Sequence, residues 1–244
     1  MLILLPPSET KRSGGVGISI DKLAIIWAAL DPARDQLIDA LQSLCADSAL
    51  ATKALGLGKQ SANDLAANLE LRTAPTLPAV LRYNGVLFEA LDYPNLSESA
   101  KQRVTEKLFI QSALFGLLPA SEQIPYYRFS ASSSLPGVNL KKVWTEAHAA
   151  VWPRMIGPIL DMRSNAYVDL NPVPEANESY FVEIFDSSGK AMNHFNKKAK
   201  GVLTRAALER NLESVEQLPE IAKTVNLIAE VNGRSVRVTT PKGF

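Results

Sequence analysis

The sequence predicts an α/β fold, a mixed sheet with surrounding helices, in a single compact domain that spans residues 1–244. Three observations support this prediction. A continuous apolar run begins the chain, helical patterns dominate residues 31–107, and short strand-like segments alternate quickly in the last third. No Gly/Ser-rich linker or repeat period divides the chain, which favours one domain over two.

The first strand is predicted at Met1–Leu5, a continuous apolar run that Pro6 and Pro7 end. An uninterrupted apolar run is typical of a strand that is buried on both faces of a parallel sheet. A polar, glycine-rich loop follows at residues 8–17. It leaves the carboxyl end of the strand, where open α/β sheets usually bind their ligands. The loop is therefore a candidate for a functional site.

The middle of the chain is predicted to be mainly helical. Asp31-Pro32 places a capping residue before a proline, and leucines continue at helical spacing after it. A second strand is expected at Lys107–Leu114, a loop at residues 119–139, and a helix from Leu140 to about residue 160.

Three short strands are predicted in the last third of the chain, at Ala166–Leu170, Tyr180–Phe185 and Ala191–Phe195. A helix is expected to follow at Asn196–Asn211. The C-terminal residues then form an antiparallel hairpin of two strands, Val225–Val231 and Ser235–Thr240. Asn232-Gly233 joins them, and this dipeptide is typical of a two-residue type I′ turn.

Composition and charge exclude several classes of protein. The chain has 26 Lys and Arg residues against 25 Asp and Glu residues, so any anion binding must come from local patches. Cys45 is the single cysteine, and the apolar opening is too short for a signal sequence or a membrane span. We therefore expect a cytoplasmic protein with no membrane partner. His148 and His194 have no Cys or His at ligand spacing, and no nucleotide-binding motif is present, so no metal site and no cofactor are expected.

The sharpest local pattern is Gly-apolar-Gly-x-x-x-Ala-x-x-Leu at residues 56–65, within two helical stretches near residues 50–72. It resembles the helix-hairpin-helix element of DNA repair proteins. Gly56 and Gly58 would let the backbone approach a phosphodiester, and Lys59 would add positive charge. The alternative is a glycine cap and a tight turn between helices, which the same residues would also form.

A second pattern is a basic segment without acidic residues between Ser187 and Leu208. Its cationic side chains are Lys190, Lys197, Lys198, Lys200 and Arg205. On a helix, one side would be basic and the other apolar, which is typical of an ordinary solvated helix. The next stretch is acidic, however, so the charge is segregated, and segregated basic charge can bind phosphates.

A third group consists of polar residues where predicted strands end. Lys11 follows the first strand, Arg128 lies in the long central loop, and Asp169 lies at the end of the strand predicted from Ala166. If these segments converge, they form a cleft with two cations to hold an anion and a carboxylate to transfer protons. Because Lys11 and Arg128 would repel each other, we expect an acid or a bound anion between them, and Glu9 is one such acid.

Several longer segments, read in order, resemble those of the YaaA peroxide-stress protein family. They are Leu-Pro-Pro-Ser-Glu-Thr-Lys ending at Lys11, Arg82–Leu91, Ser112–Pro119, Pro125–Arg128 and Phe195–Gly201. The resemblance implies a bacterial cytoplasmic protein that limits free iron and the DNA damage that iron drives under peroxide. It also implies DNA binding through a basic cleft and a helix-hairpin-helix element. Glu175 falls where a well-known branch of the family also has Glu, so it joins the candidate acids.

Two functions follow from these features. The first is a peroxide-stress protein that binds double-stranded DNA without sequence preference through a basic groove. The second is an enzyme that acts on a small anionic or nucleobase-like metabolite, with Lys11, Arg128, Asp169 and Glu175 as candidate catalytic residues. Direct iron binding is less favoured, because no His, Cys or Glu cluster has ligand spacing.

Overall fold

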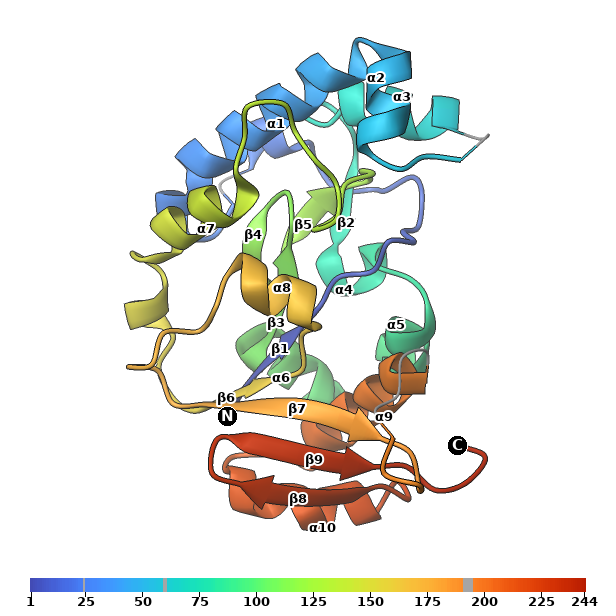
Figure 1. Ribbon diagram of the computed structural model, residues 1–244, viewed down its shortest axis with the longest axis vertical. Helices are drawn as coiled ribbons and strands as arrows, with labels where there is room; N and C mark the ends of the chain where they lie inside the picture. Colours follow the sequence, from blue (N-terminus) through green and yellow to red (C-terminus); the bar gives the residue numbers. More distant parts are fainter. Residues whose placement is uncertain (24, 59–60, 191–194) are drawn as a thin grey trace.

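The computed structural model describes residues 1–23, 25–58, 61–190 and 195–244, and these form a mixed α/β fold (Figure 1). A seven-stranded sheet has the order β4-β3-β1-β6-β7-β9-β8. Its strands are β1 (Leu2–Leu5), β3 (Leu108–Ser112), β4 (Gly116–Pro119), β6 (Ile159–Asp161), β7 (Ser179–Phe185), β8 (Ile228–Asn232) and β9 (Ser235–Thr239). A separate two-stranded sheet pairs β2 (Thr76–Pro78) with β5 (Gln123–Pro125).

The N-terminal strand β1 lies in the middle of the large sheet. It pairs in parallel with β3 on one side and with β6 on the other. Leu4 and Leu5 have no exposed surface, which confirms the prediction of a strand buried on both faces. The loop that follows therefore leaves the carboxyl edge of a parallel core, as expected from the sequence.

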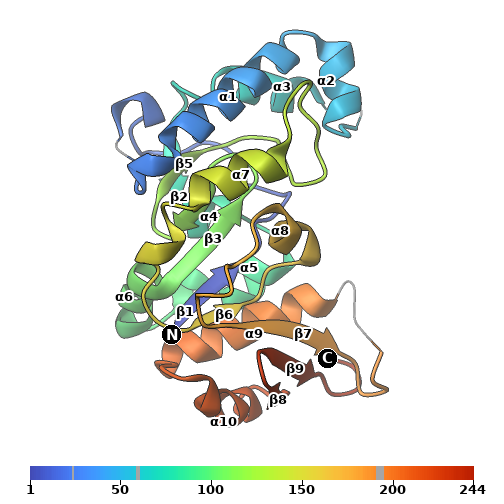
Figure 2. The ribbon, with the colours of Figure 1, turned by 60° about the vertical axis from the view of Figure 1, so that its left-hand side comes forward.

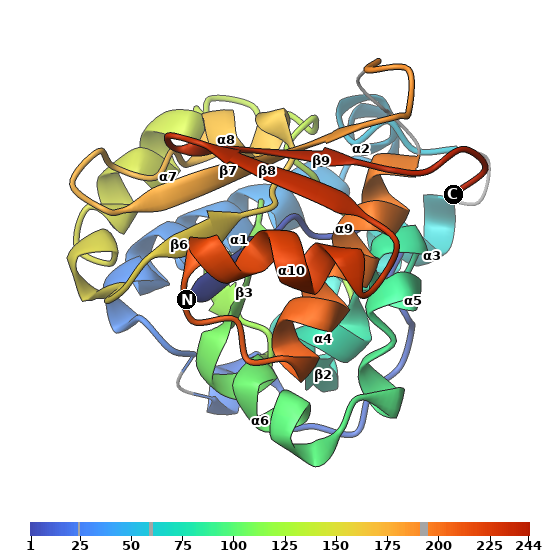
Figure 3. The same cartoon turned by 90° about the horizontal axis from the view of Figure 1, so that it is seen from below.

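Ten α-helices surround the sheets in the described part of the chain. They are α1 (Asp31–Cys45), α2 (Ser48–Ala54), α3 (Ser61–Leu69), α4 (Ala79–Arg82), α5 (Val86–Leu91), α6 (Glu98–Lys107), α7 (Leu140–His148), α8 (Asn165–Leu170), α9 (Phe195–Glu209) and α10 (Leu218–Lys223). Figures 1 and 2 show α1, α2 and α3 together at one end of the molecule, with β8, β9 and α10 at the other. α9 and α10 pack beneath β7 and β8 (Figure 3).

The side chains of capping residues set several helix starts. The Asp47 carboxylate accepts hydrogen bonds from the amides of Ala49 and Leu50 at the start of α2. Ser97 and Asn139 accept from amides in the first turns of α6 and α7. These contacts satisfy amides that have no partner within the helix. None of the described helices is long and apolar enough to cross a membrane.

Two predicted elements in the second half of the chain are wrong. The helix expected from Leu140 to about residue 160 ends at His148, and β6 pairs with β1 instead. Pro153, in the 3-10 turn Trp152–Arg154, cannot continue the α-helix, and Gly157, at φ +100°, and Pro158 then lead into β6. The strand expected at Ala166–Leu170 is helix α8. Six residues are too few to distinguish the alternating apolar pattern of a strand from the 3.6-residue pattern of a helix.

The short strands β2, β4 and β5 were not predicted, because each has three or four residues and is stabilised mainly by its partner. Strands β3 and β7 and helix α9 lie where the sequence predicts them. Residues 191–194 of the strand predicted at Ala191–Phe195 lie outside the described residues, and Phe195 begins α9.

The C-terminal hairpin is confirmed, but its turn differs from the prediction. Asn232 pairs with Ser235, so the two-residue loop is Gly233-Arg234. Only Gly233, at φ +59°, has a positive φ in this loop. A type I′ turn needs positive φ at both central positions, whereas a type II′ turn needs it at the first position only, where glycine is preferred.

A buried polar network lies where β6 meets α8 and α9. Arg163 has no exposed surface and donates to both carboxylate oxygens of Asp161, at 2.9 and 2.7 Å. Its remaining nitrogen donates to the carbonyl oxygen of Asn171 at 2.7 Å. Lys200, from α9, donates to the carbonyl oxygen of Arg163 at 3.0 Å. These bonds satisfy charged groups that would otherwise be costly to bury.

Candidate functional site

The loop after β1 is held in place by the segment before α5. Lys11 forms an antiparallel bridge with Tyr83, and the amide of Asn84 donates to the carbonyl oxygen of Thr10 at 3.0 Å. The Thr10 hydroxyl donates to the carbonyl oxygen of Asn84 at 2.9 Å. Gly85, at φ +103°, allows this approach, because a Cβ there would lie 2.9 Å from the Thr10 hydroxyl oxygen.

The Lys11 side chain lies against aromatic rings. Its Nζ is 4.2 Å from the centroid of the Tyr127 ring and 5.6 Å from that of Tyr83. Its hydrogen bond goes to the carbonyl oxygen of Glu9 at 3.4 Å. Burial, and secondly the positive charge of Arg128, lower the pKa of Lys11 to about 7. A large share of this amine is therefore uncharged at neutral pH.

Arg128 reaches the same loop from the central segment of the chain. Its Nη1 donates to the carbonyl oxygen of Glu9 at 3.1 Å, and its Nη2 lies 3.6 Å from the Glu9 carboxylate. Asn68 of α3 fixes the Arg128 backbone by accepting from its amide at 2.8 Å and donating to its carbonyl oxygen at 2.9 Å. Lys11 and Arg128 thus both reach the backbone carbonyl of Glu9, and the Glu9 carboxylate pairs with Arg128. The two cations lie close together as expected, and the bound anion stays a prediction.

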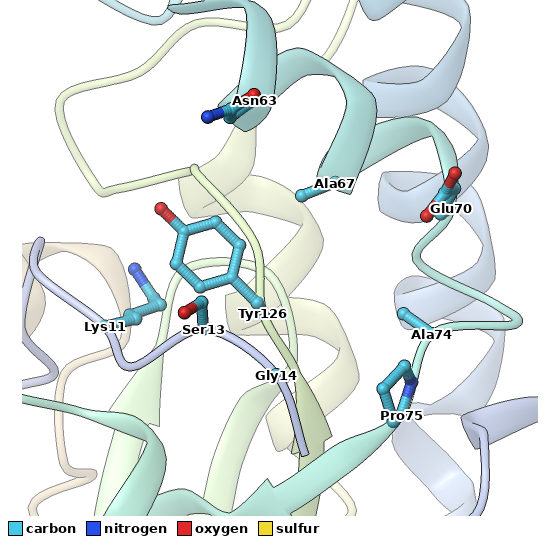
Figure 4. A pocket seen from close by; sticks show the side chains of 9 residues that line it. All are labelled: Lys11, Ser13, Gly14, Asn63, Ala67, Glu70, Ala74, Pro75 and Tyr126. Carbon is cyan, nitrogen blue, oxygen red and sulfur yellow. The ribbon is translucent and has the colours of Figure 1, made fainter. Parts of the chain in front are cut away.

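A cleft of about 570 Å³ lies beside Lys11. Its walls include Lys11 and Ser13 from the loop after β1, Asn63, Ala67 and Glu70 from the region of α3, and Tyr126. Figure 4 shows the Lys11 amine and the Tyr126 ring facing the same space. The Tyr126 hydroxyl donates to the Asp64 carboxylate at 2.7 Å. The cleft combines an amine, a phenol and carboxylates, which are groups that can transfer protons.

Beneath Lys11, three hydroxyl groups form a hydrogen-bonded chain that the sequence analysis missed. The Tyr127 hydroxyl is 2.7 Å from that of Tyr83 and 2.8 Å from that of Ser112. The Ser112 oxygen accepts from the amides of Leu114 and Phe115, so its own proton is donated to Tyr127, and that of Tyr127 to Tyr83. Burial raises the pKa of both tyrosines, which therefore stay protonated and hold the rings in a fixed position.

The sequence is similar to a known family along almost its whole length. The model of a family described as "Peroxide stress protein YaaA" matches residues 1–226. The chain belongs to the YaaA peroxide-stress protein family. A UPF0246 protein of Corynebacterium efficiens is 37% identical over 248 residues, covering 98% of this chain and 99% of the relative. A UPF0246 protein of Streptomyces coelicolor is 35% identical over 246 residues, covering 96% and 95%.

Two acids that were candidates from the sequence and the YaaA resemblance do not reach the cleft. Asp169 lies on the exposed side of α8 and does not line it. Glu175 precedes β7, at the amino edge of the parallel strands, whereas Lys11 follows the carboxyl edge. Its carbonyl oxygen accepts from Arg234 at 3.1 Å. Asp64 and Glu9 are the acids that the structure places near Lys11 instead.

The basic segment of α9 does not form one continuous cationic surface. Lys197 and Lys198 are exposed, but Lys200 is only 4% exposed and belongs to the buried network of Arg163. Arg205 donates to the Asp92 carboxylate at 3.1 Å and to the Asn95 carbonyl oxygen at 2.8 Å. α9 packs against both α5 and β7, so its buried side is wider than a simple helical wheel predicts.

The glycine pattern joins two helices, α2 and α3, as expected. Gly56 has a positive φ of +62°, whereas Gly58 does not. Among the described residues, a Cβ at either glycine would have no neighbour within 4 Å. Lys59 lies outside the described residues. Among the residues described, no three His, Cys, Asp or Glu side chains are grouped so that they could hold a metal ion.

Proposed function

We propose that this YaaA-family protein acts in peroxide stress through the cleft beside Lys11, as an enzyme on a small anionic or nucleobase-like compound. The convergence of Lys11 and Arg128 on Glu9 carries this proposal. The Glu9 side chain is 66% exposed, and its carboxylate is 3.6 Å from Arg128. Such an exposed ion pair contributes little to stability. An anionic ligand can therefore displace the Glu9 carboxylate and bind the Arg128 guanidinium in its place.

The shape and lining of the cleft support a small ligand rather than a DNA groove. Its volume of about 570 Å³ falls in the range of small-molecule sites. Tyr126 offers an aromatic ring on which a planar base can stack, and Ala67 adds an apolar surface.

The anion site predicts that arginine geometry matters as well as charge. Arg128→Lys should weaken binding of adenosine monophosphate at least about tenfold, because lysine cannot form the bidentate contact. Isothermal titration calorimetry on the full chain measures this effect. Arg210→Lys changes an exposed arginine just after α9, whereas Arg128 contacts Glu9, so it is the matched control and should leave the affinity unchanged. Equal affinities for Arg128→Lys and wild type would remove Arg128 from the site.

The same variants connect the cleft to iron-driven damage in the cell. A deletion strain should show more chelatable iron and lower survival in peroxide, and a wild-type copy should restore both. An Arg128→Lys copy should fail to restore them, whereas an Arg210→Lys copy should succeed. Full protection by Arg128→Lys, with equal protein levels, would contradict a role for the cleft in peroxide resistance.

Sequence-independent binding to duplex DNA is the second candidate function. None of the described residues lies within 4 Å of a Cβ placed at Gly56 or Gly58, which favours this function because a phosphodiester could approach the backbone there. The exposed Lys197 and Lys198 add positive charge elsewhere on the surface. With about four phosphate contacts, the slope of log affinity against log salt would be roughly −3.6.

Two variants test DNA binding with little risk to the fold. Gly58→Val has room for its side chain and no positive φ, so stability should change by less than about 0.5 kcal/mol. It should nevertheless weaken duplex binding by holding the backbone away from a phosphate. Lys197→Glu with Lys198→Glu should weaken binding to all sequences alike and reduce the slope to roughly −1.8. Wild-type affinity for both variants in a gel-shift assay would reject the DNA interface.

A further inference from the structure

We propose that Lys11 is a reacting amine, which forms an imine with a small anionic compound that carries an aldehyde or ketone group. This inference rests on the proposed anion site, and it adds the class of substrate and the covalent step. An exposed lysine binds anions as an ammonium ion, but a lysine that is largely uncharged can act as a nucleophile instead.

The fold directs the Lys11 amine toward the cleft. The backbone is fixed by the bridge to Tyr83, and the amide of Arg12 donates to the carbonyl oxygen of Arg82 at 2.9 Å. The side chain then passes over the Tyr127 ring and lines the cleft beside Tyr126 (Figure 4). The hydroxyl chain of Tyr83, Tyr127 and Ser112 holds this aromatic support in place.

The charges around Lys11 favour the free amine. Two acids, Glu9 and Asp64, act to raise its pKa, while Arg128 and Arg82 act to lower it. Among the described residues, no carboxylate forms an ion pair with its ammonium group, because the Glu9 carboxylate pairs with Arg128. The two tyrosines that face it are neutral, and burial is the largest influence. Desolvation without a paired carboxylate is the environment of known imine-forming lysines.

Arg128 sets the class of compound that can react. Arg128 and Lys11 both donate to the Glu9 carbonyl oxygen, so a ligand held by the guanidinium lies close to the amine. A carboxylate or phosphate bound by Arg128 would place an attached carbonyl group beside Nζ. Small 2-oxo acids and phosphorylated aldehydes have this combination, and the cleft is large enough for either.

The covalent step balances without an added oxidant or reductant. The Nζ lone pair forms a bond to the carbonyl carbon, and the electrons of the C=O π bond move to oxygen. The two N–H protons of the amine then leave with that oxygen as water, and a C=N bond remains. Solvent in the open cleft, or the Tyr126 hydroxyl paired with Asp64, can carry the protons between nitrogen and oxygen.

Reductive trapping of the wild-type full chain tests this proposal. The protein is incubated with glyoxylate and sodium cyanoborohydride at pH 7, and carboxymethylated lysines are located by peptide mass spectrometry. Lys53 is exposed and serves as the internal control. Lys11 should react at least about 100-fold faster than Lys53, because an ordinary exposed lysine has well under about 1% of its amine free at this pH, whereas a large share of the Lys11 amine is free. Equal rates at the two lysines, or no reaction at Lys11, would overturn the proposal.

The pH dependence provides a check that accessibility alone would not produce. Above pH 8, the free amine of an ordinary exposed lysine increases about tenfold per pH unit, whereas that of Lys11 is already near its maximum. The ratio of Lys11 to Lys53 modification should therefore fall about tenfold per unit between pH 8 and 10. A ratio that stays constant over this range would show that Lys11 titrates like an exposed lysine and would overturn the proposal.

Two further experiments distinguish imine formation at Lys11 from anion binding at Arg128. Because the Arg128 charge also lowers the pKa of Lys11, Arg128→Gln should slow trapping at Lys11 by both aldehydes, but it should slow glyoxylate about tenfold more than neutral acetaldehyde. Glycolate has the carboxylate of glyoxylate without the aldehyde. If glycolate binds wild type but not Arg128→Gln, and Lys11 is never trapped, the imine proposal fails and the anion site stands. Equal slowing with both aldehydes would overturn the assignment of an anionic substrate.

Discussion

Gly201→Ala is expected to destabilise the protein by about 3 kcal/mol or more, the upper part of the range for overpacking a buried contact. At Gly201, α9 crosses α5 so closely that an added Cβ would overlap the carbonyl oxygen of Leu87. It would also lie 2.8 Å from the Cβ of Ala90. The obstacle is helix backbone, which cannot rotate away as a flexible side chain can. Relief therefore requires the two helices to separate.

Urea unfolding at equilibrium measures this effect, and Gly58→Ala is the matched control. An added Cβ at Gly58 meets none of the described residues within 4 Å, so that variant should differ from wild type by less than about 0.5 kcal/mol. Separation of the helices would also strain the bonds from Arg205 to the loop that follows α5. Wild-type stability for Gly201→Ala would mean that α5 moves away at little cost.

Asp161→Asn is expected to reduce the free energy of unfolding by about 3–5 kcal/mol. The change keeps the shape of the side chain but removes the negative charge that faces Arg163. Neither side chain is more than 5% exposed, so water cannot compensate the guanidinium that remains. The cost arises from a buried charge that has lost its partner, not from the modest net value of the intact pair.

The surface pair of Asp35 and Arg72 supplies the control. Its carboxylate is 60% exposed and its N···O distance is 2.9 Å, so Asp35→Asn should cost less than about 1 kcal/mol. Replacing both buried partners, with Asp161→Leu and Arg163→Met together, should recover part of the stability lost in Asp161→Asn. A single Asp161→Asn variant that unfolds at the wild-type urea concentration would contradict this account.

The elements that the sequence predicts correctly are those whose pattern reflects local burial. β1 is a continuous apolar run, α9 has helical spacing over many residues, and the C-terminal hairpin carries a glycine turn. β4 and β6 are short segments whose conformation depends on β3 and β1, so their own residues carry little signal. The conformation of such short elements is determined by contacts with distant segments of the chain.

In the candidate site, too, some residues carry a local sequence signal and others depend on distant contacts. Lys11 and Arg128 could be predicted because polar residues at strand ends and in long loops tend to be functional. The supporting tyrosines Tyr83 and Tyr127 resemble ordinary core residues in the sequence, and only the fold places their rings beneath the amine. Lys200 could not be recognised as buried, because its burial depends on how α9 packs against its neighbours.

The central position of β1 has a consequence for how the chain folds during synthesis. β1 is made first, yet its sheet partners begin only at Leu108 and Ile159. At a translation rate of roughly 5–20 residues per second, the second partner follows on the order of ten seconds later. Until β3 is made, the apolar residues of β1 have no strand to pair with, and one edge of β1 stays open until β6 follows. Nascent chains of this topology therefore depend on the early helices α1–α6, or on a chaperone, to cover their N-terminal strand.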